Sequence, residues 1–351
     1  MSSPDVVVVG AGIIGVSLAL ELRARGASVT ILERGAPGQE ASSAAAGMLA
    51  ATDPETPSAL QPIASESARL YPDFVEMIER SSGMNVDFRS HGTMAIGELD
   101  TAPPEYVALT EKEISLLEPA ILSNTLPVYL VAEASVDPVL LIRAALKSAG
   151  LAGVEIQTAT EFREAHSSLS GVEVVTSTGT ISCQAVVNCC GAWSGAPVRP
   201  RKGQMLYVRP ENTMLIQHVV RAADAYIVPR SSGKILIGAT VEDVGFDKRV
   251  DPATIQQLHQ AASRYLPQVA KAEIISSWAG LRPGTPDDLP IMGQIEPGMF
   301  VASGHFRNGI LLAPITAKLM ADLISGLQPA MDLSPFSASR FAPSEISSTR
   351  G

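Results

Sequence analysis

The stretch Val6-Val7-Val8-Val9-Gly10-Ala11-Gly12-Ile13-Ile14-Gly15 decides the fold of this chain. Its run of valines is typical of a strand that is buried on both faces. The glycines form a G-x-G-x-x-G motif, and a helix is predicted next over residues 16–25, with Gly26 as its C-cap. A second strand is predicted over residues 28–32 and ends in Glu33. This order of strand, glycine turn, helix and strand predicts an α/β dinucleotide-binding fold.

Each glycine of the motif meets a different physical need. Gly10 permits the tight turn out of the strand, Gly12 lets a pyrophosphate approach the backbone, and Gly15 lets the helix pack closely on the strands. The N-terminus of the helix offers free N–H groups and a partial positive charge to a phosphate. Glu33 stands where an acid accepts hydrogen bonds from ribose hydroxyls, and its charge argues against the 2′-phosphate of NADP. The alternative is a glycine turn that holds no ligand.

The composition of the chain restricts its domain number and the classes of protein to which it could belong. The chain has 351 residues, of which 46% are hydrophobic and 18% charged, enough for one large domain or two interleaved ones. A net charge of −10 and a pI of about 5.1 disfavour nucleic-acid binding, which needs a basic surface. No apolar run reaches the roughly 18 residues of a membrane span, and no basic N-terminal region predicts a signal peptide.

The cysteines and histidines indicate neither a disulfide framework nor a metal site. Cys183, Cys189 and Cys190 form no C-x-x-C pair, so a reducing cytoplasm is the expected location. Buried inert thiols are preferred over redox-active ones, because free cysteine behaves as a small hydrophobe. The five histidines have no spacing typical of metal ligands, and no metal is predicted.

A segment of small residues follows the second strand. It reads Ala41-Ser42-Ser43-Ala44-Ala45-Ala46-Gly47-Met48-Leu49, and small side chains let backbone approach a ligand closely. Ser42 and Ser43 could cap a helix and donate hydrogen bonds to a phosphate. The alternatives are a flexible linker and an ordinary alanine-rich helix.

Further elements are expected along the chain. Helices are predicted within residues 50–90 and over 110–117, 137–150, 255–265 and 311–324. Strands are predicted over residues 91–98, 154–156, 172–175, 180–182, 185–188, 205–208, 215–220, 225–229, 234–239, 274–278 and 300–302. The segment 280–293 is expected to be irregular because it is rich in glycine and proline.

These motifs together resemble the D-amino-acid oxidase family of FAD-dependent oxidoreductases, and within it the bacterial glycine oxidases of thiazole (thiamine) synthesis. The resemblance rests on Glu33-Arg34, on the small-residue segment and on five later segments. These are Gly191-Ala192-Trp193-Ser194, Arg201-Lys202-Gly203-Gln204-Met205, Gly280-Leu281-Arg282-Pro283-Gly284-Thr285, Gly304-His305-Phe306-Arg307-Asn308-Gly309-Ile310 and the closing residues 335–341. It covers nearly the whole chain.

The resemblance implies a Rossmann-like FAD-binding domain of the GR2 type, interleaved with an antiparallel-sheet α+β substrate domain. Residues 1–88, 136–203 and 279–342 would form the FAD-binding domain, and residues 89–135 and 204–278 the substrate domain. Residues 343–351 would form a flexible tail.

FAD is the implied cofactor, bound non-covalently. The resemblance assigns its contacts to the glycine turn, the small-residue segment and the segment before the last helix: Gly10, Gly12, Ile13, Ile14, Gly15, Glu33, Arg34, Ala41, Ser42, Ala46, Gly47, Met48, Phe162, Gly191, Gly304, His305, Phe306, Arg307, Asn308, Gly309 and Ile310. The dipole of the last helix would stabilise negative charge on the reduced flavin.

The substrate residues are also implied by the resemblance. Arg282 matches the arginine that binds the substrate carboxylate, Tyr226 a tyrosine that hydrogen-bonds the same group, and Arg307 a second polar contact near the amine. Val241 falls where a larger apolar residue shapes the pocket in some relatives, so a broader substrate range is possible here. The structural alternatives are surface salt bridges for the arginines, a core ring for Tyr226 and strand packing for Val241.

The implied reaction is oxidation of glycine or another small amine. The α-hydrogen leaves as hydride to flavin N5, the imine hydrolyses to an oxo acid and ammonia, and O2 reoxidises the flavin to give H2O2. A sarcosine or D-amino-acid oxidase or dehydrogenase remains an alternative, as does a non-catalytic nucleotide-binding module. A homo-oligomer is possible.

Overall fold

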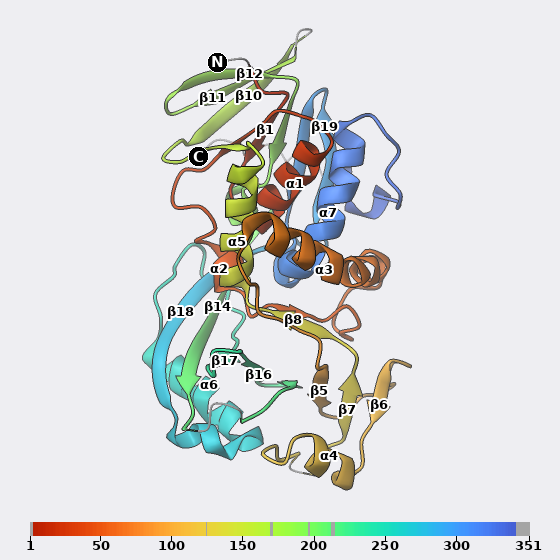
Figure 1. Ribbon diagram of the computed structural model, residues 1–351, viewed down its shortest axis with the longest axis vertical. Helices are drawn as coiled ribbons and strands as arrows, with labels where there is room; N and C mark the ends of the chain where they lie inside the picture. Colours follow the sequence, from red (N-terminus) through yellow and green to blue (C-terminus); the bar gives the residue numbers. More distant parts are fainter. Residues whose placement is uncertain (1–2, 124, 169–170, 196, 212–214, 342–351) are drawn as a thin grey trace.

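The computed structural model describes residues 3–123, 125–168, 171–195, 197–211 and 215–341 (Figure 1). Its upper part in Figure 1 is built on a six-stranded sheet with the strand order β19-β20-β13-β1-β2-β9. The sheet comprises β1 (Val6–Val9), β2 (Val29–Leu32), β9 (Glu155–Gln157), β13 (Ala185–Asn188), β19 (Ile291–Glu296) and β20 (Met299–Ser303). All neighbouring pairs are parallel except β19 with β20. The predicted doubly covered first strand is confirmed, since all of β1 is buried.

The two faces of β1 are covered by different layers. Val6 and Val8 pack into the large core formed with four helices, α1 (Ile13–Ala24), α3 (Gln61–Ser82), α5 (Pro138–Leu151) and α7 (Gly309–Ile324). Val7 and Val9 face a three-stranded sheet, whose strands are β10 (Phe162–Ser168), β11 (Gly171–Thr176) and β12 (Gly179–Cys183). This double burial explains why the strand consists of valines without polar alternation.

The glycine turn is as tight as its sequence predicts. A Cβ on Gly15 would overlap the carbonyl oxygen of Gly10, and Gly10 itself has a φ of +104°. The helix begins at Ile13, three residues earlier than predicted, because Gly12 is extended and the turn ends there. The hydroxyl of Ser42 accepts a hydrogen bond from the Ile13 N–H at 2.9 Å.

The lower part of the molecule is built on an eight-stranded sheet with the order β18-β14-β17-β16-β15-β5-β7-β6. Its strands are β5 (Thr93–Ile96), β6 (Tyr106–Ala108), β7 (Val128–Val131), β14 (Arg199–Arg209), β15 (Val219–Ala222), β16 (Tyr226–Pro229), β17 (Ile235–Gly238) and β18 (Glu273–Gly284). Every pair is antiparallel except β15 with β5. Helices α4 (Glu111–Leu117) and α6 (Pro252–Tyr265) contribute to the core of this part.

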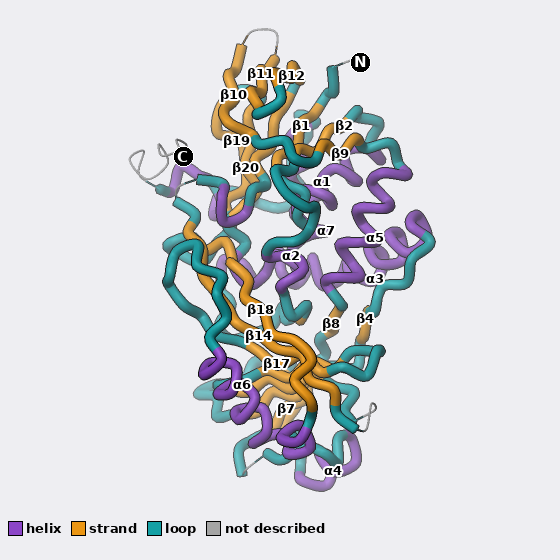
Figure 2. The backbone as a smooth tube through the Cα atoms, turned by 90° about the vertical axis from the view of Figure 1, so that its left-hand side faces the viewer, coloured by secondary structure: helices purple, strands orange, loops and turns teal. Residues whose placement is uncertain are grey.

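Small elements lie between the two large sheets. They are α2 (Ala41–Ala44) and a sheet of β3 (Met48–Leu49), β8 (Ala134–Val136) and β4 (Phe88–Arg89). The two long strands β14 and β18 pair along their length and run between the two parts of the molecule (Figure 2). The domain limits expected at residues 203 and 279 fall inside these strands, and this division stays a proposal.

Several predicted element limits are wrong. Residues 280–284 belong to β18 and residues 291–296 to β19, although irregular structure was expected there. Pro283 is tolerated because β18 is an edge strand, where a missing N–H costs no sheet bond. The helix expected to stop at Gly150 continues to Leu151, and the strand expected from residue 215 begins at Val219. The predicted tail, residues 343–351, lies outside the described residues.

Candidate active site

A cavity of about 840 Å³ lies between the two large sheets. On one side it is lined by residues at the carboxyl ends of β1, β2, β13 and β20, where open α/β sheets bind ligands. On the other side it is lined by residues of the eight-stranded sheet and of the loops next to it. Its volume is within the range of about 300–1,000 Å³ that is usual for ligand sites.

The structure brings most of the predicted site residues together around this cavity. Those that line it are Gly10, Gly12, Ile13, Ile14, Glu33, Arg34, Ala41, Ser42, Ala46, Gly47, Met48, Phe162, Gly191, Tyr226, Val241, Arg282, His305, Phe306, Arg307, Asn308, Gly309 and Ile310. Gly15 and Gly304 do not line it. Gly15 packs the helix against the turn, and Gly304 has a φ of +76° with no room for a Cβ beside Thr285.

The glycine-turn end of the cavity suits the phosphates and ribose of a dinucleotide. The Glu33 carboxylate accepts hydrogen bonds from the backbone N–H groups of Ala11 (3.0 Å) and Gly35 (2.8 Å), which place it beside the turn. The Arg34 guanidinium lies 4.4 Å from the centre of the Trp193 ring. A Cβ on Gly10 would come within 2.6 Å of the Cys189 carbonyl oxygen, so only glycine fits this turn.

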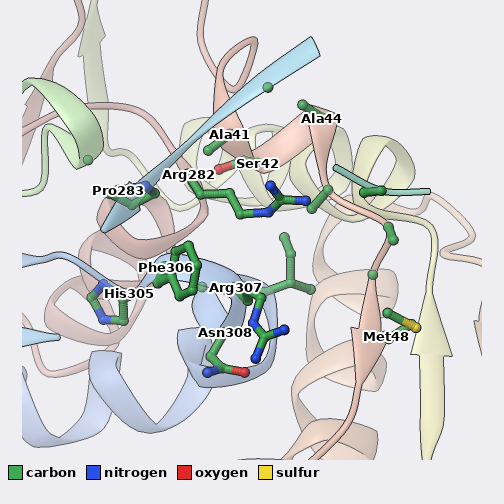
Figure 3. A pocket seen from close by; sticks show the side chains of 18 of the residues that line it. Ala41, Ser42, Ala44, Met48, Arg282, Pro283, His305, Phe306, Arg307 and Asn308 are labelled. Carbon is green, nitrogen blue, oxygen red and sulfur yellow. The ribbon is translucent and has the colours of Figure 1, made fainter. Parts of the chain in front are cut away.

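A polar pair lies on the wall formed by the eight-stranded sheet. Arg282, in β18, donates from Nη1 to the Thr240 carbonyl oxygen at 3.0 Å. Tyr226, at the start of β16, donates its hydroxyl to the sulfur of Met205 at 3.3 Å. Burial raises the pKa of Tyr226, and the positive charge of Arg282 opposes this rise only in part, so the phenol stays protonated as a donor. Figure 3 shows the Arg282 side chain extending across the pocket above Phe306 and Arg307.

The opposite wall is the turn that leads into α7. Arg307 forms an ion pair with Glu55 at 2.6 Å, and its guanidinium lies 5.6 Å from the centre of the Phe306 ring. The His305 ring is buried and bonds to the Thr316 hydroxyl in α7 at 3.1 Å. Burial lowers the pKa of His305 to about 3, so its imidazole is neutral.

Val241 lies at the rim of the cavity. Its side chain is 56% exposed, so it borders the site without closing it. Cys189 and Cys190 also line the cavity. Burial raises the pKa of Cys190 to about 12, and it also raises the pKa of Cys189.

Sequence reasoning missed a partly buried polar cluster, of which Arg221, Tyr106 and Asp53 line the cavity. Arg221, in β15, pairs with Glu133 at 2.9 Å and donates to the Tyr106 hydroxyl at 2.6 Å, while Asp53 lies 3.9 Å away. The four residues come from separate segments of the chain, so no local sequence motif predicts that they form a cluster. Within the described part of the chain, no group of three or more His, Cys, Asp or Glu residues forms a metal-binding cluster.

No helix in the described ranges has both the length and the apolarity that a membrane crossing requires.

Comparison with known proteins identifies the family. Residues 5–323 match the family DAO, described as FAD dependent oxidoreductase. The chain is 36% identical to a glycine oxidase of Geobacillus kaustophilus, over 96% of this chain and 97% of that protein. It is 38% identical to the bifunctional protein ThiO/ThiG of Trichormus variabilis, over 96% of this chain but 55% of that longer protein.

A solved structure agrees with the sequence relatives. The crystal structure of glycine oxidase from Geobacillus kaustophilus superposes with a TM-score of 0.91 at 34% identity, covering 97% of this chain and 100% of that one. FAD is accordingly the cofactor of this chain. The chain belongs to the DAO family of FAD-dependent oxidoreductases and is an FAD-dependent amine oxidoreductase of the glycine oxidase type.

Proposed function

We propose that this enzyme oxidatively deaminates glycine and other small amines or amino acids, with O2 as the electron acceptor. The products are an imine, then glyoxylate or another oxo acid, ammonia and H2O2. The observation that carries the proposal is the pair of Arg282 and Tyr226 on one wall of the FAD cavity, opposite the turn before α7. An arginine and a protonated phenol together suit a carboxylate.

The two cavity arginines differ in their partners. Arg307 is paired with the Glu55 carboxylate, whereas Arg282 donates to the neutral carbonyl of Thr240. A substrate carboxylate therefore gains a new charge pair at Arg282 and meets competition at Arg307. This difference supports Arg282 as the carboxylate anchor, with Tyr226 as the second donor and Arg307 near the amine end.

The cofactor supplies the redox chemistry: when bound, FAD accepts the hydride that leaves the α-carbon of the amine. The residues of this chain hold and orient the partners. The glycine turn and the N-terminus of α1 would bind the pyrophosphate, and Glu33 the ribose. Residues 44–48 and 305–310, with Ala41 and Ser42, would flank the rest of the cofactor. The amine binds deprotonated, so no side chain is needed as a general base.

An anaerobic titration tests the proposal. The oxidised protein should show a flavin spectrum that bleaches when glycine is added without oxygen. Air should restore the colour and release H2O2, with glyoxylate and ammonia formed in equal amounts. A flavin that stays oxidised with glycine but bleaches with sarcosine or D-alanine would replace the substrate assignment by one of those alternatives. FAD should be non-covalent, so acid precipitation should leave the yellow colour in the supernatant.

We also propose a role in thiamine thiazole synthesis, supported by the names of the ThiO/ThiG relatives. A cytoplasmic location stays a prediction from cysteine usage.

A further inference from the structure

We propose that Gly203 and Gly238 are positioning residues for the carboxylate-binding pair, because their missing Cβ atoms leave the space that Arg282 and Tyr226 occupy. This inference rests on the proposed function, in which Arg282 and Tyr226 bind the substrate carboxylate. It assigns a specific task to two glycines in the wall of the eight-stranded sheet, separate from the glycines of the dinucleotide turn.

The strand register places Arg282 and Gly203 on the same face. Arg201 pairs with Arg282 across β14 and β18, and Gly203 is two residues further along β14. Side chains alternate along a strand, so Gly203 is the diagonal neighbour of Arg282 on the cavity face. A Cβ on Gly203 would lie 2.5 Å from Cζ and Nη2 of Arg282 and closer still to Nη1. The guanidinium therefore lies directly on the bare backbone of Gly203.

The same arrangement recurs one strand away. Gly238, in β17, pairs with Met205 on one side and with Tyr226 on the other. The Tyr226 ring crosses Gly238, and its hydroxyl reaches the Met205 sulfur at 3.3 Å. A Cβ on Gly238 would lie 2.6 Å from three atoms of Tyr226, Cε2, Cζ and the hydroxyl oxygen. The phenol thus also lies flat on a residue without a side chain.

The contact of Arg282 with Gly203 and that of Tyr226 with Gly238 set how far each hydrogen-bond donor lies from the sheet backbone. The Arg282 guanidinium fills the space that a Cβ on Gly203 would need, and its Nη1 donates to the Thr240 carbonyl oxygen. An alanine at position 203 needs no strained backbone, because φ of Gly203 is outside the left-handed region. The added methyl would instead displace the flexible end of Arg282. A misplacement of about 1 Å in a positioning group can cost on the order of 100-fold in rate.

The first experiment compares holoenzymes carrying Gly203→Ala and Gly150→Ala. Gly150 is the matched control, because a Cβ there meets no heavy atom within 4 Å apart from its own helix backbone and its chain neighbours. Gly203→Ala should raise KM for glycine about tenfold or more and weaken acetate binding, read from the flavin spectrum, by a similar factor. Flavin content should match that of the control. An unchanged KM and an unchanged acetate affinity would overturn the proposal.

The second experiment is a double-mutant cycle with Arg282→Ala. If Gly203 acts through Arg282, then Gly203→Ala should change acetate affinity less than about twofold once Arg282 has been removed. A full effect that persists without Arg282 would overturn the positioning role. If Arg282→Ala alone leaves kcat/KM and acetate affinity intact, the proposed function has failed at its anchor, and that failure is seen without any glycine variant.

The folding yield of the variants provides an independent test of the contact between Gly203 and Arg282. If Gly203→Ala alone does not fold but the double variant Gly203→Ala/Arg282→Ala does, the clash with Arg282 is demonstrated. If both fail to fold, the methyl conflicts with something other than Arg282, and the proposal is wrong. Gly238→Ala, measured alone and with Tyr226→Ala, tests the second contact in the same way. A loss at Gly238 that Tyr226→Ala does not remove would refute that half of the proposal.

Discussion

The carboxylate of Glu33 accepts a hydrogen bond from the backbone N–H of Ala11, so the acid at the end of β2 is bound to the turn after β1. Glu33 also accepts from the Gly35 N–H. These bonds hold the carboxylate at the carboxyl edge of the parallel sheet, which is the side of the sheet that binds nucleotides. The position of the Glu33 carboxylate thus follows from the pairing of β1 with β2, together with one hydrogen bond from its own loop.

Replacing Glu33 should weaken cofactor binding. We expect Glu33→Ala to cost about 1–3 kcal/mol in FAD affinity, the range for leaving a buried hydrogen-bonding group without its partner. Fluorescence titration of the apoprotein with FAD measures this. Glu76→Ala, at an exposed acid on α3, is the control and should leave the affinity unchanged. Equal affinities for the two variants would remove Glu33 from the ribose site.

Replacing Arg282 should impair catalysis but not cofactor binding. Leaving a buried carboxylate without its charge partner costs about 2–5 kcal/mol, so Arg282→Ala should lower kcat/KM for glycine by roughly 30-fold to several thousand-fold. Arg282→Lys should recover part of the loss, because an ammonium cannot form the two-pronged contact. H2O2 formation and bound flavin are measured on the same samples. A flavin-loaded Arg282→Ala enzyme with near-normal kcat/KM would redirect attention to Arg307.

His305 should make the fold sensitive to acid. Burial lowers its pKa to about 3, while the unfolded chain binds the proton near the ordinary value of 6.5. The unfolded state therefore binds more protons between these values, and stability falls as the pH is lowered through this window. The contribution of His305 has a slope of at most about 1.4 kcal/mol per pH unit.

Urea unfolding at a series of pH values measures that slope. His305→Gln removes the titrating group, so its stability should decline less steeply than that of the wild type between roughly pH 6 and 4. His166→Gln, whose parent side chain is 59% exposed, serves as the control and should follow the wild-type slope. Parallel curves for all three proteins would show that His305 is not the buried neutral group described above.

The three thiols should be inert in the folded protein. Burial raises the pKa of Cys183 to about 11 and that of Cys190 to about 12, and the pKa of Cys189 is raised as well. The thiolate is the reactive form, so iodoacetamide at about pH 8 should label none of them in the native state and all of them in urea. Mass spectrometry gives the count. Fast labelling of native Cys190 would point to a redox-active thiol instead.

Some sequence-based expectations were wrong because contacts between distant segments, such as strand pairing, decide the structure there. Residues 280–284 contain two glycines and a proline, and by composition they are irregular. They form a strand because β14 pairs with β18 from Arg199 to Arg209 and supplies the hydrogen bonds. Likewise, the cluster of Arg221, Glu133 and Tyr106 brings together two strands and a loop that are distant along the chain. Composition and periodicity contain no information about such partners.

The sequence alone determined the parts of this protein whose cause is local. A valine strand, a turn that only glycine can form and a helix begun at that turn are dictated by residues next to each other, so Gly10 to Glu33 could be interpreted directly. Family resemblance named Arg282 and Tyr226. Only the tertiary structure decided that Gly203 and Gly238 lie beneath these side chains, because the register between neighbouring strands sets which residues share a face. That register arises from packing across the whole sheet, and no single segment contains it.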